Sequence, residues 1–153
     1  MNIIIREVQE EDLEKCAKAF SGAYSGEPWN HKWDIDRAIQ YLSEYYNSSK
    51  FIGYIVCDEY NQVLAGLFAH ERTWFNSSEI YIDEVFVSPE AQGQGLATKL
   101  LNKVKEIVKT RRLLGISLMT HRGFPAEQVY KKHGFTKEPE LMYMEFDPKN
   151  GSN

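Results

Sequence analysis

Cysteine is scarce in this sequence, and its two copies are not arranged for a disulfide framework or a metal site. Cys16 and Cys57 match no zinc-ligand spacing. The histidines form no paired spacing typical of metal ligands, so we interpret each as a surface or capping residue; they are His31, His70, His121 and His133. We therefore expect no metal, and two packed thiols in a reducing, cytoplasmic compartment.

Long apolar runs and an excess of positive charge are also missing. No stretch approaches the roughly 18–20 apolar residues that a membrane span needs, and the first residues lack the basic and apolar regions of a signal peptide. Lys and Arg number 18 against 22 Asp and Glu, which gives a net charge of −4. We therefore expect neither a membrane partner nor a nucleic-acid partner.

The chain does have enough apolar residues for one core. Of its 153 residues, 42% are hydrophobic and 13% are aromatic, which is typical of a globular domain of this length. We expect a single domain over residues 1–147 and a disordered tail over residues 148–153, where the composition turns polar.

Apolar periodicity predicts the order β-α-α-β-β-β-α-β-α-β. The expected strands are Ile3–Val8, Phe51–Asp58, Val63–Thr73, Glu79–Val87, Gly115–Thr120 and Leu141–Phe146. The expected helices are Glu10–Ser25, Asp34–Tyr46, Gly95–Arg112 and Pro125–His133. Three consecutive strands followed by alternating helices and strands indicate the α/β class, with a central mixed sheet and helices on both of its faces.

The most informative segment is the turn between the strand that ends at Val87 and the helix that begins at Gly95. Unpaired first-turn amides and the helix dipole favour an anion there, and Gly93 and Gly95 let oxygen atoms approach the backbone. No carboxylate lies between Gln92 and Thr98. The turn is therefore suited to a pyrophosphate, although the two glycines alone also fit an ordinary tight turn.

Longer motifs around this turn resemble those of the GCN5-related N-acetyltransferase (GNAT) family. They are Ile82-x-x-Val85-x-Val87-x-Pro89, Gln92-x-x-Gly95-x-Ala97 and Tyr130-x-x-x-Gly134-Phe135. The resemblance covers residues 3–146 and implies a GNAT-like acyl-CoA N-acyltransferase fold. It extends to bacterial small-molecule and aminoglycoside-type members, with Gly123 standing where many members have asparagine.

The resemblance implies acetyl-CoA as cosubstrate and no metal. The main chains of Val85 and Val87 would hold its pantetheine arm, and the amide near Val85 would face the thioester oxygen. The residues whose backbone would bind its pyrophosphate are Gln92, Gly93, Gln94, Gly95, Ala97 and Thr98.

The resemblance also gives three candidate catalytic side chains. Tyr130 matches the family's general acid, which protonates the leaving thiolate; without the family it would be interpreted as a core tyrosine. A base must deprotonate the amine, and Asp83 and Glu84 lie on the strand that would carry the thioester. Strand alternation places these two on opposite faces unless a bulge intervenes. Alignment with aminoglycoside acetyltransferases favours Asp83 over Glu84, and a surface carboxylate is the alternative for either.

The acceptor pocket is expected between the first two helices, the region that varies with substrate in this family. Trp29 and Trp33 would wall it or simply cap the core, Glu27 would attract a cation, and Tyr81 shares the strand face of Asp83. We expect acetyl transfer to a primary amine of a small molecule, with an amino sugar as one candidate. The alternatives are a protein or peptide acetyltransferase and a non-catalytic acyl-CoA sensor. Dimers are common in the family, so a homodimer is expected without a readable interface.

Overall fold

The computed structural model describes residues 2–149, whose elements follow the predicted order up to the last expected strand. The strands are β1 (Ile3–Glu7), β2 (Phe51–Asp58), β3 (Val63–Thr73), β4 (Ser78–Val87) and β5 (Ile116–Leu118). The α-helices are α1 (Leu13–Ser25), α2 (Ile35–Tyr46), α3 (Leu96–Arg111) and α4 (Pro125–Lys132). Two short 3₁₀ turns, η1 (Glu10–Asp12) and η2 (Pro89–Ala91), lead toward α1 and α3.

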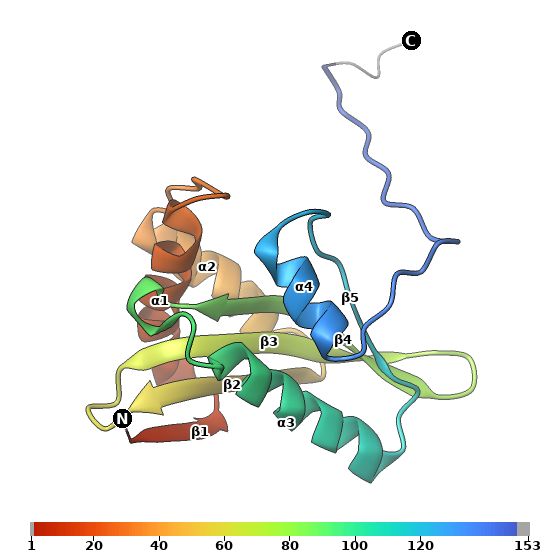
Figure 1. Ribbon diagram of the computed structural model, residues 1–153, viewed down its shortest axis with the longest axis horizontal. Helices are drawn as coiled ribbons and strands as arrows, with labels where there is room; N and C mark the ends of the chain where they lie inside the picture. Colours follow the sequence, from red (N-terminus) through yellow and green to blue (C-terminus); the bar gives the residue numbers. More distant parts are fainter. Residues whose placement is uncertain (1, 150–153) are drawn as a thin grey trace.

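The strands form one mixed sheet in the order β1-β2-β3-β4-β5. Neighbouring strands are antiparallel except for β5, which runs parallel to β4. The chain reaches β5 from β4 through α3, because a parallel pair needs a crossover connection. Figure 1 shows α3 in front of the sheet and α2 behind it. The predicted mixed sheet with helices on both faces is therefore confirmed.

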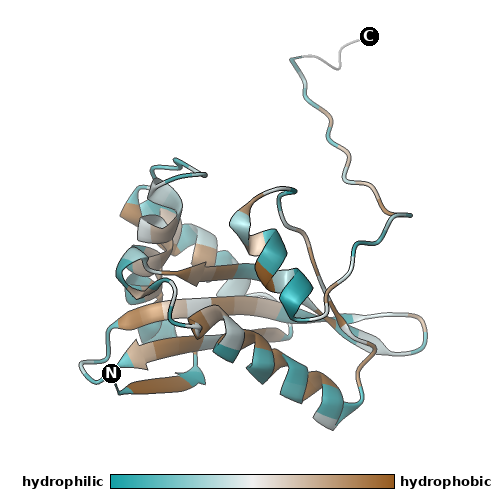
Figure 2. Ribbon diagram, in the orientation of Figure 1, coloured by the Kyte–Doolittle hydropathy of each residue, from teal (hydrophilic) through white to brown (hydrophobic). Residues whose placement is uncertain are grey.

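Each face of the sheet has its own apolar cluster. Phe20, Leu42 and Phe68 belong to the cluster beneath α1 and α2, whereas Leu67 and Leu100 belong to the cluster beneath α3. Adjacent residues of β3 thus point to opposite faces, as side chains along a strand do. Figure 2 shows the result as brown strands and helices striped brown and teal. Among residues 2–149, no helix is both long and apolar enough to cross a membrane.

The predicted last strand, Leu141–Phe146, is wrong for this structure. The segment runs away from the body of the molecule (Figure 1) and pairs with no described strand. Its composition favours a strand, but a strand also needs a partner for its backbone groups. Met144 is 80% exposed and Phe146 is 75% exposed. Most of the predicted tail, residues 150–153, lies outside the described residues.

Candidate active site

A β-bulge in β4 determines which side chains face α2. Phe68 of β3 is paired with Glu84, and the next residue, Ala69, is paired with Ile82, so Asp83 is an extra residue in β4. An inserted residue resets the alternation of side chains along the strand. Asp83 and Glu84 therefore both face the α2 side, where their carboxylates find partners. The expectation that they point to opposite faces is corrected.

The carboxylate of Glu84 is enclosed and held by two tyrosine hydroxyls. Tyr41 of α2 donates to Oε1 at 2.6 Å, and Tyr24 of α1 donates to Oε2 at 2.9 Å. Burial raises the pKa of Glu84, and the two hydroxyls partly oppose that shift. Burial and the nearby carboxylate also raise the pKa of both tyrosines, so they stay protonated as donors. Glu84 is thus an oriented carboxylate of increased basicity.

Asp83 lies against a histidine that the sequence pattern did not single out. Nδ1 of His70, on β3, is 2.7 Å from Oδ2 of Asp83. The Asp83 side chain is 8% exposed and that of His70 is 28% exposed. Burial raises the pKa of Asp83, and the hydrogen bond from His70 opposes the shift. His70 is therefore part of a half-buried pair, and its interpretation as a surface or capping residue is wrong.

A cavity of about 360 Å³ opens beside these groups. Its lining residues are Tyr41, Glu44, Tyr45 and Ser48 of α2 and His70 of β3. Tyr41 connects the cavity to the enclosed carboxylate, because its hydroxyl also donates to Glu84. The hydroxyls of Tyr41 and Tyr45 are 3.2 Å apart. The cavity therefore brings together the histidine–aspartate pair, the tyrosines and the side of α2.

The two predicted acceptor tryptophans occupy different environments. The ring centroid of Trp29 lies 5.0 Å from that of Tyr24 and 4.8 Å from that of Phe124, which precedes α4. Trp29 thus bridges α1 and the segment after β5, next to a tyrosine that holds Glu84. Trp33 packs against the core, with its ring centroid 5.0 Å from that of Tyr41, and it lines a separate cavity with His31 and Arg37.

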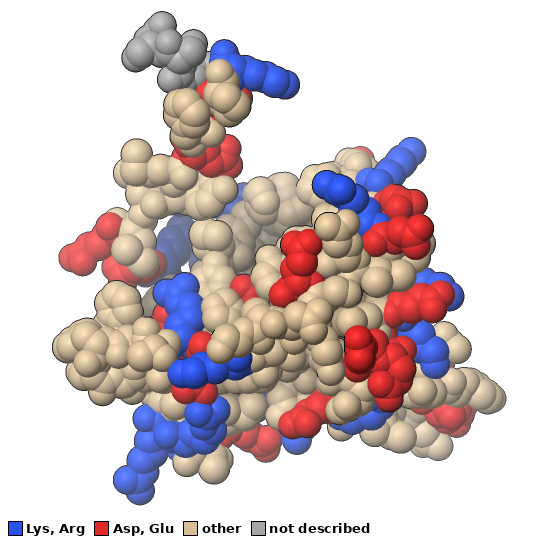
Figure 3. Space-filling view, turned by 180° about the vertical axis from the view of Figure 1, so that it is seen from behind, with Lys and Arg blue, Asp and Glu red and all other residues tan. Residues whose placement is uncertain are grey.

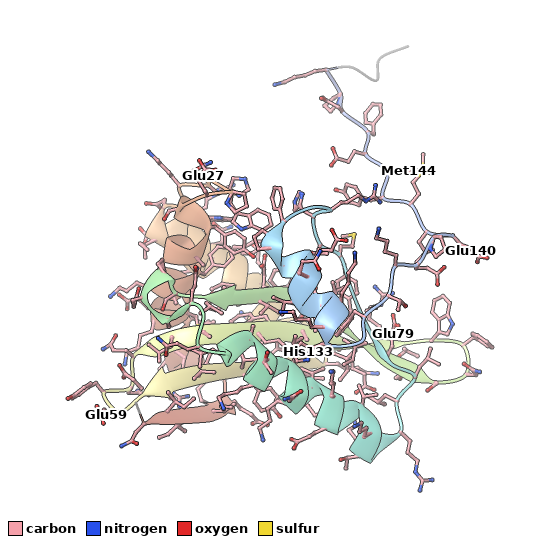
Figure 4. All side chains as sticks on the ribbon, in the orientation of Figure 1. Glu27, Glu59, Glu79, His133, Glu140 and Met144 are labelled. Carbon is pink, nitrogen blue, oxygen red and sulfur yellow. The ribbon has the colours of Figure 1, made fainter. Side chains whose placement is uncertain are left out.

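The other two predicted acceptor residues also separate. The ring of Tyr81 lies beside His70, with the centroids 5.7 Å apart, and the guanidinium of Arg72 sits 4.8 Å from its centroid. Tyr81 therefore adjoins the cavity. Glu27 is exposed, and Figure 4 shows it on the loop at the far end of α1, away from the sheet. The structure does not bring Glu27 together with the cavity.

The turn after β4 has the backbone that the glycines predict. Gly93 and Gly95 adopt positive φ angles of 78° and 77°, and a Cβ at either position would point into open space. The side-chain amide Nε2 of Gln92 donates to the carbonyl of Val87 at 3.3 Å, which ties the turn to the strand. The first turn of α3 contains no acidic residue. The backbone is therefore open to an anion at this helix N-terminus.

β4 and β5 run side by side only briefly. Their pairing covers Ile80–Ile82 and Ile116–Leu118. Val85 and Val87 lie beyond it, so no described strand pairs with them on the β5 side. Their main-chain groups on that side are available to another extended group.

Two predicted residues connect α3 and α4. The hydroxyl of Thr98 lies 3.0 Å from Nε2 of His133, which joins the start of α3 to the end of α4. Tyr130 packs against Phe135, with the ring centroids 5.6 Å apart. Burial, with a contribution from the charge of Glu84, raises the pKa of Tyr130 to about 12. Its phenol therefore stays protonated at neutral pH and lies within electrostatic reach of Glu84.

Comparison of the sequence with known families gives one clear match. The acetyltransferase (GNAT) family matches residues 6–135. This span includes the β4 bulge, the glycine turn and Tyr130.

Two curated relatives resemble most of the chain. An uncharacterized N-acetyltransferase of Methanocaldococcus jannaschii, MJ1207, is 28% identical over 152 residues, which cover 88% of this chain and 61% of that protein. The acetyltransferase Atu2258 of Agrobacterium fabrum is 28% identical over 142 residues, which cover 90% of this chain and 85% of that protein. The chain thus spans less than two thirds of the Methanocaldococcus protein.

Solved structures share the fold over nearly the whole chain. A possible acetyltransferase from Clostridium difficile 630 has a TM-score of 0.79 at 20% identity, covering 96% of this chain and 99% of that one. An aminoglycoside acetyltransferase, HMB0005, from an uncultured soil metagenomic sample has a TM-score of 0.72 at 23% identity, with the same coverage of 96% and 99%. These similarities establish the fold that carries the cavity and the glycine turn.

Proposed function

The chain belongs to the acetyltransferase (GNAT) family, and we propose that it transfers the acetyl group of acetyl-CoA to the primary amine of a small molecule. The observation that carries this proposal is the β4 bulge, which turns Asp83 and Glu84 to one side of the strand, beside a cavity. Both cysteines are buried in the core cluster beneath α1 and α2. Direct attack of the amine on the thioester therefore suits the site better than a cysteine-bound acyl group.

The backbone between β4 and α3 supports acetyl-CoA as the cosubstrate. Gly93 and Gly95 leave open space above a helix N-terminus without acidic residues, which suits a pyrophosphate. The pyrophosphate would contact the backbone from Gln92 through Gln94 to Ala97 and Thr98. The main chains of Val85 and Val87 would hold the pantetheine amides, and the Val85 amide would donate to the thioester oxygen as negative charge develops there. Acetyl-CoA would supply the activated acetyl group.

A carboxylate of the bulge would remove a proton from the attacking amine. Burial raises the pKa of both Asp83 and Glu84, which brings each closer to the basicity that proton abstraction at neutral pH requires. Glu84 is the better supported of the two, because two hydroxyls orient its carboxylate while burial keeps its pKa raised. The carboxylate of Asp83 is instead paired with the ring of His70.

Tyr130 would donate the proton that the leaving thiolate requires. Its raised pKa of about 12 keeps the phenol protonated throughout the range in which an amine would be acetylated. The electrostatic influence of Glu84 on Tyr130, which lies on α4, supports an acid and a base that would act at one reaction centre.

The acceptor is proposed to be cationic and polyhydroxylated or similarly polar, with an amino sugar as the leading class. Glu44 lines the cavity together with tyrosine hydroxyls, and Asp83 and Glu84 add negative charge beside it. Tyr81 and Trp29 would contribute aromatic walls. Figure 3 shows acidic side chains interspersed with basic ones on the face opposite to that of Figure 1. Trp33 would support the wall through Tyr41, and Glu27 would act only at a distance.

We also propose a cytoplasmic homodimer whose domain covers residues 1–147. The exposed segment Leu141–Phe146 supports a dimer, because five large apolar side chains project from an extended chain with no described partner. The buried free thiols support a reducing compartment.

The test is release of free CoA thiol from acetyl-CoA in the presence of kanamycin, spermidine, lysinamide or a basic peptide. Calorimetric binding of acetyl-CoA is measured beside it. Release with kanamycin, spermidine or lysinamide is the expected result, and mass spectrometry then locates the acetyl group on nitrogen. Release with the peptide alone would make the protein a peptide acetyltransferase. Binding without release on any amine would favour an acyl-CoA sensor and would overturn the proposal.

A further inference from the structure

His70 is a basic group at the cavity, and the acetyl transfer proposed above gives it no role. His70 lines the cavity, whereas its partner Asp83 is almost fully buried behind it. When the carboxylate is ionised it accepts the hydrogen bond, so Nδ1 carries the proton and Nε2 of the neutral ring keeps its lone pair. A histidine oriented in this way by a buried carboxylate is arranged as a proton acceptor.

We propose that His70 receives the proton that converts the acceptor from ammonium to free amine, and that Asp83 is the positioning residue of His70. This inference rests on the proposed function and adds a catalytic group to it. The amine nitrogen must lose two protons when an ammonium becomes an amide. One proton balances the thiol that forms when the carbon–sulfur bond breaks, and the other must leave for solvent. His70 carries this second proton.

The burial of the two basic groups supports this division. Glu84 is enclosed by Tyr24 and Tyr41 and lies within electrostatic reach of Tyr130. A proton on Glu84 therefore stays close to the acid that protonates the thiolate. His70 is 28% exposed and borders the open cavity, so a proton on its ring can leave for water and the base is regenerated.

The groups around His70 are carboxylates and tyrosines from two elements. Asp83 and Tyr81 face it from β4, and Tyr41, Glu44 and Tyr45 face it from α2. Two of these five are carboxylates. The guanidinium of Arg72 lies 4.8 Å from the centroid of the Tyr81 ring, and its charge acts on Asp83. Two carboxylates, Asp83 and Glu44, thus lie beside the ring that would carry the transferred proton.

The decisive variant is His70→Asn. Asparagine places an amide N–H near the position of Nδ1, so it can still donate to Asp83, but it offers no basic nitrogen. With whichever of kanamycin, spermidine and lysinamide the wild type acetylates, we expect kcat/KM for the amine at pH 7 to fall by about 10²-fold. The loss should shrink as the pH approaches the pKa of the acceptor amine, because the amine is then already neutral. KM for acetyl-CoA should stay unchanged.

The matched control is His31→Asn, the same substitution at a cavity formed by the start of α2 and the residues before it. It should keep the wild-type pH profile. A merely structural role of His70 would give a loss that is the same at every pH, and this result would overturn the inference. Unchanged kcat/KM at pH 7 would also overturn it.

Nuclear magnetic resonance of the free protein gives an answer that does not depend on the acceptor. In ¹⁵N-histidine-labelled wild type we expect the neutral His70 ring to be the tautomer that carries its proton on Nδ1. The Asp83→Asn substitution should change the populations of the two neutral tautomers. A neutral Nε2–H ring, or an imidazolium that persists across about pH 6–9, would contradict the inference even if no amine in the panel were acetylated. If the wild type releases no CoA while the Nδ1–H form is observed, the proposed function fails and the oriented base remains.

Discussion

Asp83 is a single inserted residue, yet it determines which charges β4 presents to α2. Without it, Glu84 and its predecessor would alternate between the two faces of the sheet. With it, two carboxylates lie on one face, and the charge of Asp83 contributes to the raised pKa of Glu84. Like charges at short range each make ionisation of the other less favourable. The bulge therefore increases the basicity of Glu84 in addition to orienting its side chain.

Glu84→Gln should change how stability depends on pH. Burial raises the folded-state pKa of Glu84 above its ordinary value of 4.5. Between those two pKa values the folded protein holds a proton that the unfolded chain has lost, so wild-type stability falls as the pH rises through this interval. The Glu84→Gln variant has no ionisable group at this position, so its stability does not fall for this reason. Its free energy of unfolding relative to wild type should therefore increase from about pH 4 upward and level off above the raised pKa.

Urea unfolding of both proteins at intervals between about pH 4 and pH 8 measures this difference. Glu59→Gln, in the turn between β2 and β3, is the control and should show no such increase. If the difference in free energy of unfolding between Glu84→Gln and wild type were the same at every pH, the pKa of Glu84 would not be raised in the folded protein.

Tyr130→Phe should lower kcat by about 10–100-fold, within the range typical of a lost general acid. Because the pKa of Tyr130 is raised to about 12, its phenol is protonated over the whole assay range. The loss should therefore be uniform between about pH 6 and pH 9, and binding of acetyl-CoA should be unaffected. Tyr60→Phe, at an exposed position in a turn, is the control. Turnover equal to wild type would remove Tyr130 from the mechanism.

At the scale of whole elements, local patterns predict most of the structure. Apolar spacing gives α1 to α4 and β1 to β5 within a few residues, and the glycine turn is recognised from its own residues. The bulge was not predictable in this way, because it depends on how β4 pairs with β3. The role of His70 has the same origin, since it follows from a cross-strand neighbour 13 positions away. A histidine on the strand before an Asp-Glu pair is the signal that could have suggested it.

The glycine turn allows the charge of the bound group to be tested separately from the backbone. Gly95→Ala and Gly95→Asp both place an L side chain at a φ of 77°, and neither Cβ meets a neighbouring atom. Both variants should therefore lose similar stability, on the order of 1 kcal/mol. The aspartate should in addition repel the pyrophosphate, so we expect acetyl-CoA to bind it at least about 10-fold more weakly than the alanine variant.

Calorimetric titration of acetyl-CoA into both variants measures that ratio, and thermal unfolding confirms that their stabilities match. Equal affinities would mean that the pyrophosphate does not lie over Gly95. Dephospho-CoA, which keeps the pyrophosphate, should show the same ratio. Pantetheine, which lacks it, should bind both variants alike.

At the scale of the whole molecule, the C-terminal segment is the feature that a single chain leaves unexplained. Its exposed apolar side chains are Leu141, Met142, Tyr143, Met144 and Phe146. Burying one such side chain stabilises a protein by roughly 1.5–3 kcal/mol, and monomers rarely expose a contiguous patch of this kind. The segment also runs away from the body (Figure 1) and pairs with no described strand. Both features favour association with a second copy of the chain.

In an extended segment, Met142, Met144 and Phe146 share one face, so Met144→Asp places a charge at the centre of the more apolar side. Sedimentation velocity at about 50 µM should give twice the 17.8 kDa of the chain for wild type, and a single chain for Met144→Asp. Glu140→Gln, beside the same segment but outside the apolar face, should remain dimeric. Wild type that sediments as one chain at this concentration would overturn the proposed homodimer. Circular dichroism of Met144→Asp separates dissociation from unfolding, because the core clusters on both faces of the sheet lie elsewhere and should keep their structure.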